Sequence, residues 1–364
     1  MLRALLAAGL TLTAAVDRPQ APDLEFRSDV RMIRLDVSVV SGSGLPVAGL
    51  LPKDFAVEED GEPVEIALFE AFAPGHAREG ESPIRVEAAG PRRLILVLDT
   101  GAMHIRELIR ARISGERFLR LHTDAGDWVR VIDRSTGRAW SGAIPEDQNR
   151  LVAAIRGIGR RTQGAWLTAG DFDDPIASVD EDVGEGGASA STRNEVFLSQ
   201  FAQATGLLGL LESLLVQLSG VDGRKGVVLI SPGFPHLRNL DRRLEQVSSL
   251  ARDAATAIYF VDSRGLDGLT PSPGQRLVPA FESAWARSGG AQDLAAATGG
   301  FTARFSNALD PALSRVAAEM RTYYVLGYRP LRPFDGGFRE VKVKVAGKGL
   351  KARTKKGYLA GYGL

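Results

Sequence analysis

The stretch "LILVLDTGAMH", residues 94–104, decides the fold of this chain. Its first five residues are all aliphatic, which is typical of a central parallel strand covered on both faces. Asp99 stands where the strand ends and a helix follows, because apolar residues recur at helical spacing through 105–121. The sequence therefore predicts an α/β unit built around this strand.

The alternation of strands and helices continues as far as residue 330. Further buried strands are expected at 128–132, 225–235, 255–264 and 321–330. Helices are expected at 146–158, 195–218, 240–254, 289–298 and 309–320. This order predicts a doubly wound, mainly parallel sheet with helices on both faces.

Residues 30–40 show the two-residue alternation of a half-buried strand, and Asp60-Gly61 predicts a hairpin turn later in the N-terminal segment. The same alternation at 341–345 and 350–354, with a turn at 346–349, predicts a hairpin at the C-terminal end. Since two strands alone are marginally stable, we expect one β-sandwich built from both ends. The expected domains are a β-sandwich of 28–71 with 336–358, a linker at 72–91, and an α/β domain at 92–330 with a flexible loop insertion at 160–193.

Composition excludes several classes of function. The 364 residues contain no cysteine and four histidines, which removes thiol nucleophiles and cysteine-ligated metal sites. The net charge of +1 gives no general attraction to nucleic acid. Residues 1–21 have the short apolar stretch and small residues of a signal peptide, so a secreted or periplasmic protein is expected. No later segment is expected to be a transmembrane span.

Several motifs in order resemble a von Willebrand factor type A (VWA) domain. They are "RRLILVLDTGAMH", "GDWVRVI" and "GRKGVVLISPGF", flanked by "LDVSVVSGSGLPVAGLLPKDFAVEEDGEPVEIALFE" and "FREVKVKV". The chain is most similar to the secreted bacterial "VWFA-related" proteins that are common in acidobacteria, over residues 28–358. The resemblance implies a Rossmann-like binding module without catalytic activity, whose ligand site lies at the carboxyl ends of the parallel strands.

The resemblance also implies an Mg²⁺ or Mn²⁺ site, and the residues depart from it. The family holds the ion with Asp-x-Ser-x-Ser, a loop threonine and a second aspartate. Asp99 matches, but Gly101 and Met103 replace the serines, and Ser231 stands where the second aspartate is expected. Thr100 has the wrong spacing, and the loop threonine is either Thr162 or Thr168.

One carboxylate does not offset the dehydration of Mg²⁺, so a degenerate site without a cofactor is expected, and bound Mg²⁺ is the alternative. The structural alternative for Asp99 is an acceptor for the amides that begin the 104–121 helix. A crevice that binds a partner protein is expected, with Met103 and Phe234 giving it an apolar rim. Its residues are Asp99, Thr100, Gly101, Ala102, Met103, His104, Ser231, Pro232, Gly233 and Phe234.

The sequence also allows other functions. The acidic residues 171–185 could serve a metal-dependent enzyme or enzyme subunit, although their spacing does not match a calcium loop. A purely structural envelope protein is a third hypothesis. Ser231 lacks the Gly-x-Ser-x-Gly context of a nucleophile. The basic run 342–356 is expected to be the solvated face of a ribbon that guards a sheet edge, with anionic glycan or lipid as the alternative ligand.

Overall fold

A six-stranded sheet forms the centre of the α/β part of the computed structural model, which describes residues 32–74, 84–87, 91–159, 190–221, 223–266 and 286–361. The strand order is β11-β10-β9-β6-β7-β8, and only β8 runs antiparallel. The strands are β6 (Arg93–Leu98), β7 (Trp128–Asp133), β8 (Arg138–Ala143), β9 (Lys225–Ser231), β10 (Thr256–Asp262) and β11 (Thr302–Ala303). The predicted mainly parallel α/β sheet is confirmed.

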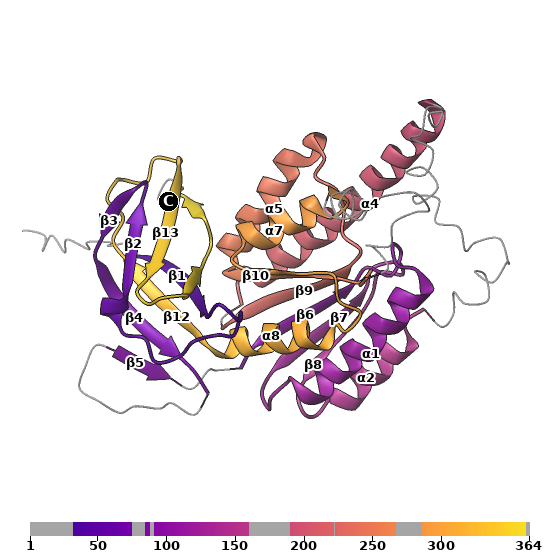
Figure 1. Cartoon of the computed structure of the whole chain (residues 1–364), viewed down its shortest axis with the longest axis horizontal. Coiled ribbons are helices and arrows are strands. Elements are labelled where there is room, and N and C mark those ends of the chain that lie inside the picture. Colours follow the sequence, from indigo (N-terminus) through magenta and orange to yellow (C-terminus); the bar gives the residue numbers. More distant parts are fainter. Residues whose placement is uncertain are drawn as a thin grey trace, which may run out of the picture. The chain divides into compact units, whose positions relative to one another are not determined.

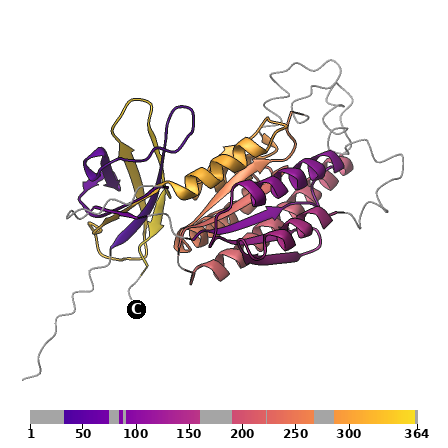
Figure 2. The same ribbon diagram turned by 90° about the horizontal axis from the view of Figure 1, so that it is seen from below.

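Helices cover both faces of this sheet (Figure 1, Figure 2). Leu94, Leu96 and Leu98 join one apolar cluster with three helices, and Ile95 and Val97 join a second cluster with the other three. The first face carries α1 (Ile105–Leu121), α2 (Gln148–Gly157) and α8 (Asp310–Arg321). The second carries α4 (Ala190–Leu218), α5 (Asp241–Asp253) and α7 (Gly289–Ala297). The aliphatic run in β6 is thus explained by burial on both sides.

Two further sheets form the β-sandwich part. One has the order β14-β1-β12-β4-β5, and the other has the order β15-β13-β2-β3. Their strands are β1 (Ile33–Val40), β2 (Phe55–Glu59), β3 (Glu62–Val64), β4 (Ile66–Phe72), β5 (Ile84–Glu87), β12 (Tyr323–Tyr328), β13 (Phe338–Val345), β14 (Lys351–Arg353) and β15 (Gly357–Leu359). Their ladders are antiparallel except between β4 and β5. Short 3₁₀ turns lie at Pro52–Asp54 and Arg238–Leu240.

One apolar core joins these two sheets, with Leu35 and Val37 of β1, Val57 of β2 and Val341 of β13 among its members. A buried carboxylate also links the two sheets. Glu59 Oε2 of β2 accepts hydrogen bonds from Tyr328 Oη of β12 at 2.7 Å and from Tyr358 Oη of β15 at 2.9 Å. Strands from both ends of the chain therefore depend on the same core and the same buried acceptor.

The turn predicted between β2 and β3 is present. Asp60 and Gly61 have φ values of 50° and 86°, and Glu59 pairs with Glu62 across the hairpin. Two positive φ values in succession are the geometry that favours Asp-Gly. The short side chain of Asp60 and the absence of a side chain at Gly61 allow the backbone to adopt these two positive φ values.

Three parts of the predicted organisation differ from the structure. Residues 323–328, expected as the last strand of the α/β alternation, form β12, which pairs with β1 and β4. The predicted C-terminal hairpin is not one, since β13 pairs with β2 and β15 while β14 pairs with β1 in the other sheet. The expected linker 72–91 contains β5.

Two of the predicted segments lie wholly or mostly outside the described residues. The predicted signal peptide at 1–21 lies wholly outside the described residues. The predicted loop insertion at 160–193 does so up to residue 189, and its last four residues begin α4.

Among the described residues, one helix is long and apolar enough to cross a membrane by length and composition. It is the part of α4 from Phe197 to Leu218. Leu207, Leu211 and Leu215 of this helix are at most 1% exposed and lie in the second apolar cluster of the sheet. These apolar side chains of α4 therefore pack in the core of the α/β part.

Candidate functional site

Four neighbouring parallel strands end in buried polar residues. Asp99 follows β6, Asp133 ends β7, Ser231 ends β9 and Asp262 ends β10, and each is at most 3% exposed. The order β10-β9-β6-β7 places these ends next to one another. Since a parallel sheet collects ligands at its carboxyl edge, these residues define the candidate site.

Asp99 forms an ion pair inside the protein. Its Oδ1 accepts a hydrogen bond from Arg134 Nη1 at 2.6 Å, and its Oδ2 accepts one from Ser231 Oγ at 2.6 Å. Arg134 also donates from Nη2 to the carbonyl oxygen of Gln203 in α4 at 2.7 Å. Both carboxylate oxygens therefore have donors, and the guanidinium balances the charge.

The structure does not show the alternative role expected for Asp99, in which its side chain accepts from the amides that begin the 104–121 helix. Helix α1 begins at Ile105, and its N-cap residue is His104, which makes no side-chain cap. The backbone carbonyl of Asp99 accepts from the Ala102 amide at 3.1 Å, so Asp99 closes a turn before the helix. Its side chain serves Arg134 and Ser231 rather than the amides of α1.

Asp133 accepts hydrogen bonds from the hydroxyl groups on the β7 side of the site. Its Oδ1 accepts from Thr100 Oγ1 and from Ser135 Oγ, the latter at 3.0 Å, and its Oδ2 accepts from Thr136 Oγ1 at 2.8 Å. Thr100, which lies beside Asp99 in sequence, is thus committed to a neighbouring carboxylate. The hydroxyls at this edge stabilise the loop that carries Arg134.

The loop after β9 turns inward. Ser231 Oγ accepts from the Gly233 amide at 2.9 Å, and Gly233 has a φ of 83°. A Cβ on Gly233 would lie 2.7 Å from Ser288 Cβ, so only glycine fits. The next side chain, Phe234, packs against Gly290 and is 3% exposed.

The predicted apolar rim is therefore corrected. Phe234 belongs to the second apolar cluster of the sheet, and Met103 is half-buried against the first. The exposed members of the predicted crevice are Gly101 and His104. Thr100, Ala102, Met103, Pro232 and Gly233 are half-buried, and Asp99, Ser231 and Phe234 are buried. The positive φ of Gly233 is what sends Phe234 into the core.

A second ion pair lies at the end of β10. Arg264 donates from Nε to Asp262 Oδ1 at 3.0 Å and from Nη2 to Oδ2 at 2.7 Å. Beside it, Ser263 Oγ donates to Glu107 Oε2 of α1 at 3.0 Å. Burial raises the pKa of Glu107, although the bond from Ser263 and the charge of His104 oppose that shift.

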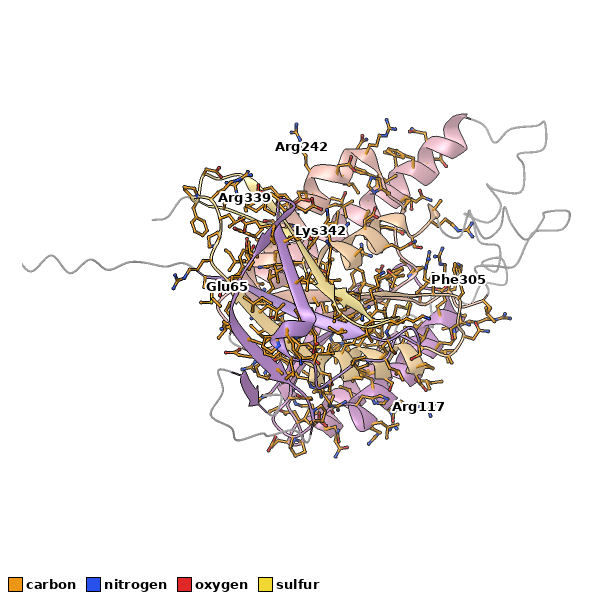
Figure 3. All side chains as sticks on the ribbon, turned by 60° about the vertical axis from the view of Figure 1, so that its left-hand side comes forward. Glu65, Arg117, Arg242, Phe305, Arg339 and Lys342 are labelled. Carbon is orange, nitrogen blue, oxygen red and sulfur yellow. The ribbon has the colours of Figure 1, made fainter. Side chains whose placement is uncertain are left out.

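Backbone strain is found at the same edge. Phe305, labelled in Figure 3, follows β11 by two residues and has a φ of 58°. That conformation is unfavourable for a bulky side chain and tends to be kept at functional sites. The Arg304 guanidinium lies 4.9 Å from the centre of the Phe305 ring.

Four residues of the site, Asp133, Arg134, Asp262 and Arg264, were not predicted from the sequence. One pattern could have revealed them, because two of the buried strands, β7 and β10, end in aspartate and an arginine follows one or two residues later, in "DRST" at 133–136 and "DSR" at 262–264. A strand-end aspartate with an adjacent arginine indicates a carboxylate that is neutralised within the chain.

The residues do not fit a divalent cation. Gly101 offers no side-chain donor, Met103 offers a thioether that suits soft metals, and the oxygens of Asp99 already accept from Arg134 and Ser231. Within the described residues, no three histidine or acidic side chains come together in a way that could hold a metal. The candidates Thr162 and Thr168 and the acidic residues 171–185 lie outside the described part of the chain.

Two lysines of the C-terminal basic run, both on β13, are matched by acidic residues. Lys344 pairs with Glu58 of β2, and Lys342, labelled in Figure 3, lies 3.2 Å from Glu340. The run was expected to guard a sheet edge; β13 lies between β15 and β2 and is not at an edge, whereas β14 forms the edge of the other sheet. Its basic side chains are an exposed face balanced by neighbouring carboxylates.

Comparison with known proteins gives no further identification. No protein-family model matches the chain, and no curated protein matches it.

Proposed function

We propose that this chain is a secreted or periplasmic, non-enzymatic binding module of the VWA type, with the doubly wound architecture of that family. In this proposal it binds a partner protein through the crevice at the carboxyl edge of the six-stranded sheet. The observation that supports it is the buried ion pair between Asp99 and Arg134.

The ion pair gives the crevice a built-in positive charge. A guanidinium at hydrogen-bond distance from Asp99 balances that carboxylate, so the loops keep their arrangement without a bound cation. Mg²⁺ at this place would have to displace Arg134 and lose its own tightly held water. The crevice therefore works as a shaped surface that needs no metal.

The accessible rim suits contact with a protein. Gly101 and His104 are exposed, and Ile105, the first residue of α1, is 45% exposed. Ile109 and Ile113 continue from it at intervals of four residues along the outer face of α1, with 44% and 55% exposure. A row of exposed aliphatic side chains that starts at a crevice is typical of an interaction surface.

Crosslinking in the native host tests this proposal with paired variants. Gly101→Arg and Ile105→Glu change the rim, and a Cβ at Gly101 would lie at 3.5 Å from Ser135 Cβ, which leaves room for a side chain. Lys348→Glu changes an exposed turn of the β-sandwich as the control. We expect both rim variants to lose a partner that the wild type and the control retain. The same partners from all four proteins would show that the crevice is inert and favour a purely structural role.

A further inference from the structure

A cleft lies at the opposite edge of the six-stranded sheet from the crevice. Its volume is about 530 Å³. Lys225 and Thr256, the first residues of β9 and β10, line it together with Asp36 of β1 and Tyr323 of β12. The cleft is therefore built by the α/β part and by the β-sandwich part, and it is separate from the proposed partner site.

Basic side chains dominate the charged lining. Two acidic residues, Asp36 and Asp253, face six basic residues: Arg34, Arg224, Lys225, Arg252, Arg353 and Lys355. The four arginines each pair with a carboxylate, such as Asp36 with Arg224 at 2.6 Å. Lys225 donates to the carbonyl oxygen of Val221, just beyond the end of α4.

Lys355 differs from the other basic residues of the cleft. Among the described residues, no carboxylate oxygen lies within ion-pair distance of its ammonium group, and no hydrogen bond is formed by it. Burial lowers the pKa of Lys355, while the charges of Asp36 and Asp253 act in the opposite direction at longer range. A desolvated ammonium without a close counter-ion gains from an anionic oxygen placed beside it.

The arginines also have unused hydrogen-bonding capacity. The Nε atoms of Arg224, Arg252 and Arg353 are buried and have no acceptor. The side chains of Arg224 and Arg252 are only 5% and 3% exposed, so water does not readily satisfy them. Buried donors without acceptors are uncommon in folded proteins and call for an acceptor in the vicinity. The Nε atoms of these arginines and the ammonium group of Lys355 therefore have no hydrogen-bond acceptor among the described residues.

One side of the cleft is aromatic. Phe72 and Tyr323 both line it, and their rings stack with centroids 4.5 Å apart and planes 7° apart. The Arg224 guanidinium lies 4.6 Å from the centre of the Tyr323 ring. Burial raises the pKa of Tyr323 to about 12, so its hydroxyl stays neutral at physiological pH. Such a wall accepts the carbon skeleton of a ligand rather than a bare ion.

We propose that this cleft binds a small organic oxyanion, whose phosphate or carboxylate group pairs with Lys355 and the lining arginines and whose carbon skeleton lies against Phe72 and Tyr323. The proposal rests on the shape, charge and unsatisfied donors of the cleft and is independent of the crevice at the other edge.

Thermal unfolding with phenyl phosphate and benzoate tests this proposal, with sodium chloride at equal ionic strength as the reference. We expect at least one of the two anions to raise the Tm of the wild type in a saturable manner beyond chloride. The stronger of the two identifies the preferred group, phosphate or carboxylate. No rise beyond chloride with either anion would overturn the proposal.

Lys355→Met separates binding from a structural role. We expect at least a tenfold weaker apparent affinity for the anion, while the Tm without anion is unchanged or higher because a half-buried charge without a close counter-ion has been removed. Lys348→Met, at an exposed lysine outside the cleft, should respond like the wild type. An undiminished anion response in Lys355→Met, or a lower Tm of this variant without anion, would contradict the assignment.

Discussion

The carboxyl edge of the sheet repeats one arrangement of residues. Asp99 pairs with Arg134, and two strands away Asp262 pairs with Arg264. In both pairs the acid is nearly fully buried, and the arginine comes from a loop that directly follows a strand. Because Asp99 and Asp262 each have an internal cation, these two buried carboxylates are balanced without metal ions.

The pair between Asp99 and Arg134 should contribute strongly to stability. Arg134→Met leaves the carboxylate buried with Ser231 as its one remaining side-chain donor, so we expect a loss of roughly 3 to 5 kcal/mol in the free energy of unfolding. Asp99→Asn combined with Arg134→Met should recover much of this loss, because no uncompensated charge remains. Urea unfolding measures both variants.

Arg106→Met is the control for that experiment, because Arg106 is exposed on α1. It should change the free energy of unfolding by no more than about 0.5 kcal/mol. If Arg134→Met were as mild as Arg106→Met, the ion pair would not be what holds the crevice together.

Glu107 should make stability depend on pH. Its pKa is raised in the folded protein above 4.5, mainly by burial, so folding favours its protonated form. The stability from this group is complete below pH 4.5 and is lost as the pH rises through the higher pKa of the folded state. Urea unfolding of Glu107→Gln should match the wild type at pH 4 and exceed its stability at pH 8. Parallel pH profiles for the two proteins would contradict this.

At the scale of single elements, α1 shows what a pattern can and cannot predict. Its helical spacing predicted the helix correctly, but the apolar residues fall on two faces. Leu108 and Leu119 are at most 7% exposed, whereas Ile109 and Ile113 are at least 44% exposed. Periodicity does not reveal which of two apolar stripes faces the sheet, because that depends on how α2 and α8 flank the helix.

Alanine substitutions should separate the two faces of α1. Leu119→Ala creates a cavity in the core and should cost about 2 to 5 kcal/mol. Ile113→Ala, at 55% exposure, should stay within about 0.5 kcal/mol of the wild type. Chemical denaturation measures both, and equal losses would mean that the exposed stripe is covered in the folded protein.

Loops were the weakest part of the sequence prediction. Phe234 was expected on the rim because it follows a strand end, but the left-handed conformation of Gly233 turns it inward. Strand β8 was missed because "RAWSGA" has no clear alternation and pairs at the edge of the sheet. Phe234 packs against Gly290, which is distant in sequence, whereas β8 pairs with β7, the strand just before it.

At the scale of the whole chain, the two ends are interdependent. β12 follows directly after α8 in sequence, yet it lies between β1 and β4. Its residues "YYVLGY" are all buried, and such a run is equally compatible with a parallel sheet or with an inner strand of a sandwich. The sequence predicted that both chain ends contribute strands, but only tertiary pairing decides which strands adjoin.

Deletion of residues 336–364 tests this interdependence. It removes β13, β14 and β15, which leaves β2 and β1 without a neighbour on one side and Glu59 without Tyr358. We expect limited proteolysis to cut within residues 32–72 faster than in the wild type, while residues 93–133 of the parallel sheet stay resistant. Unchanged protection of residues 32–72 would show that the N-terminal strands fold without the C-terminal ones.

A crevice that needs no metal is tested most directly by calorimetric titration of the full-length protein with Mg²⁺ and Mn²⁺, repeated on Asp99→Asn. Because Arg134 already neutralises Asp99, we predict no saturable heat for either ion with either protein. Saturable binding to the wild type that is lost in Asp99→Asn would contradict it, since the crevice would then hold a metal after all.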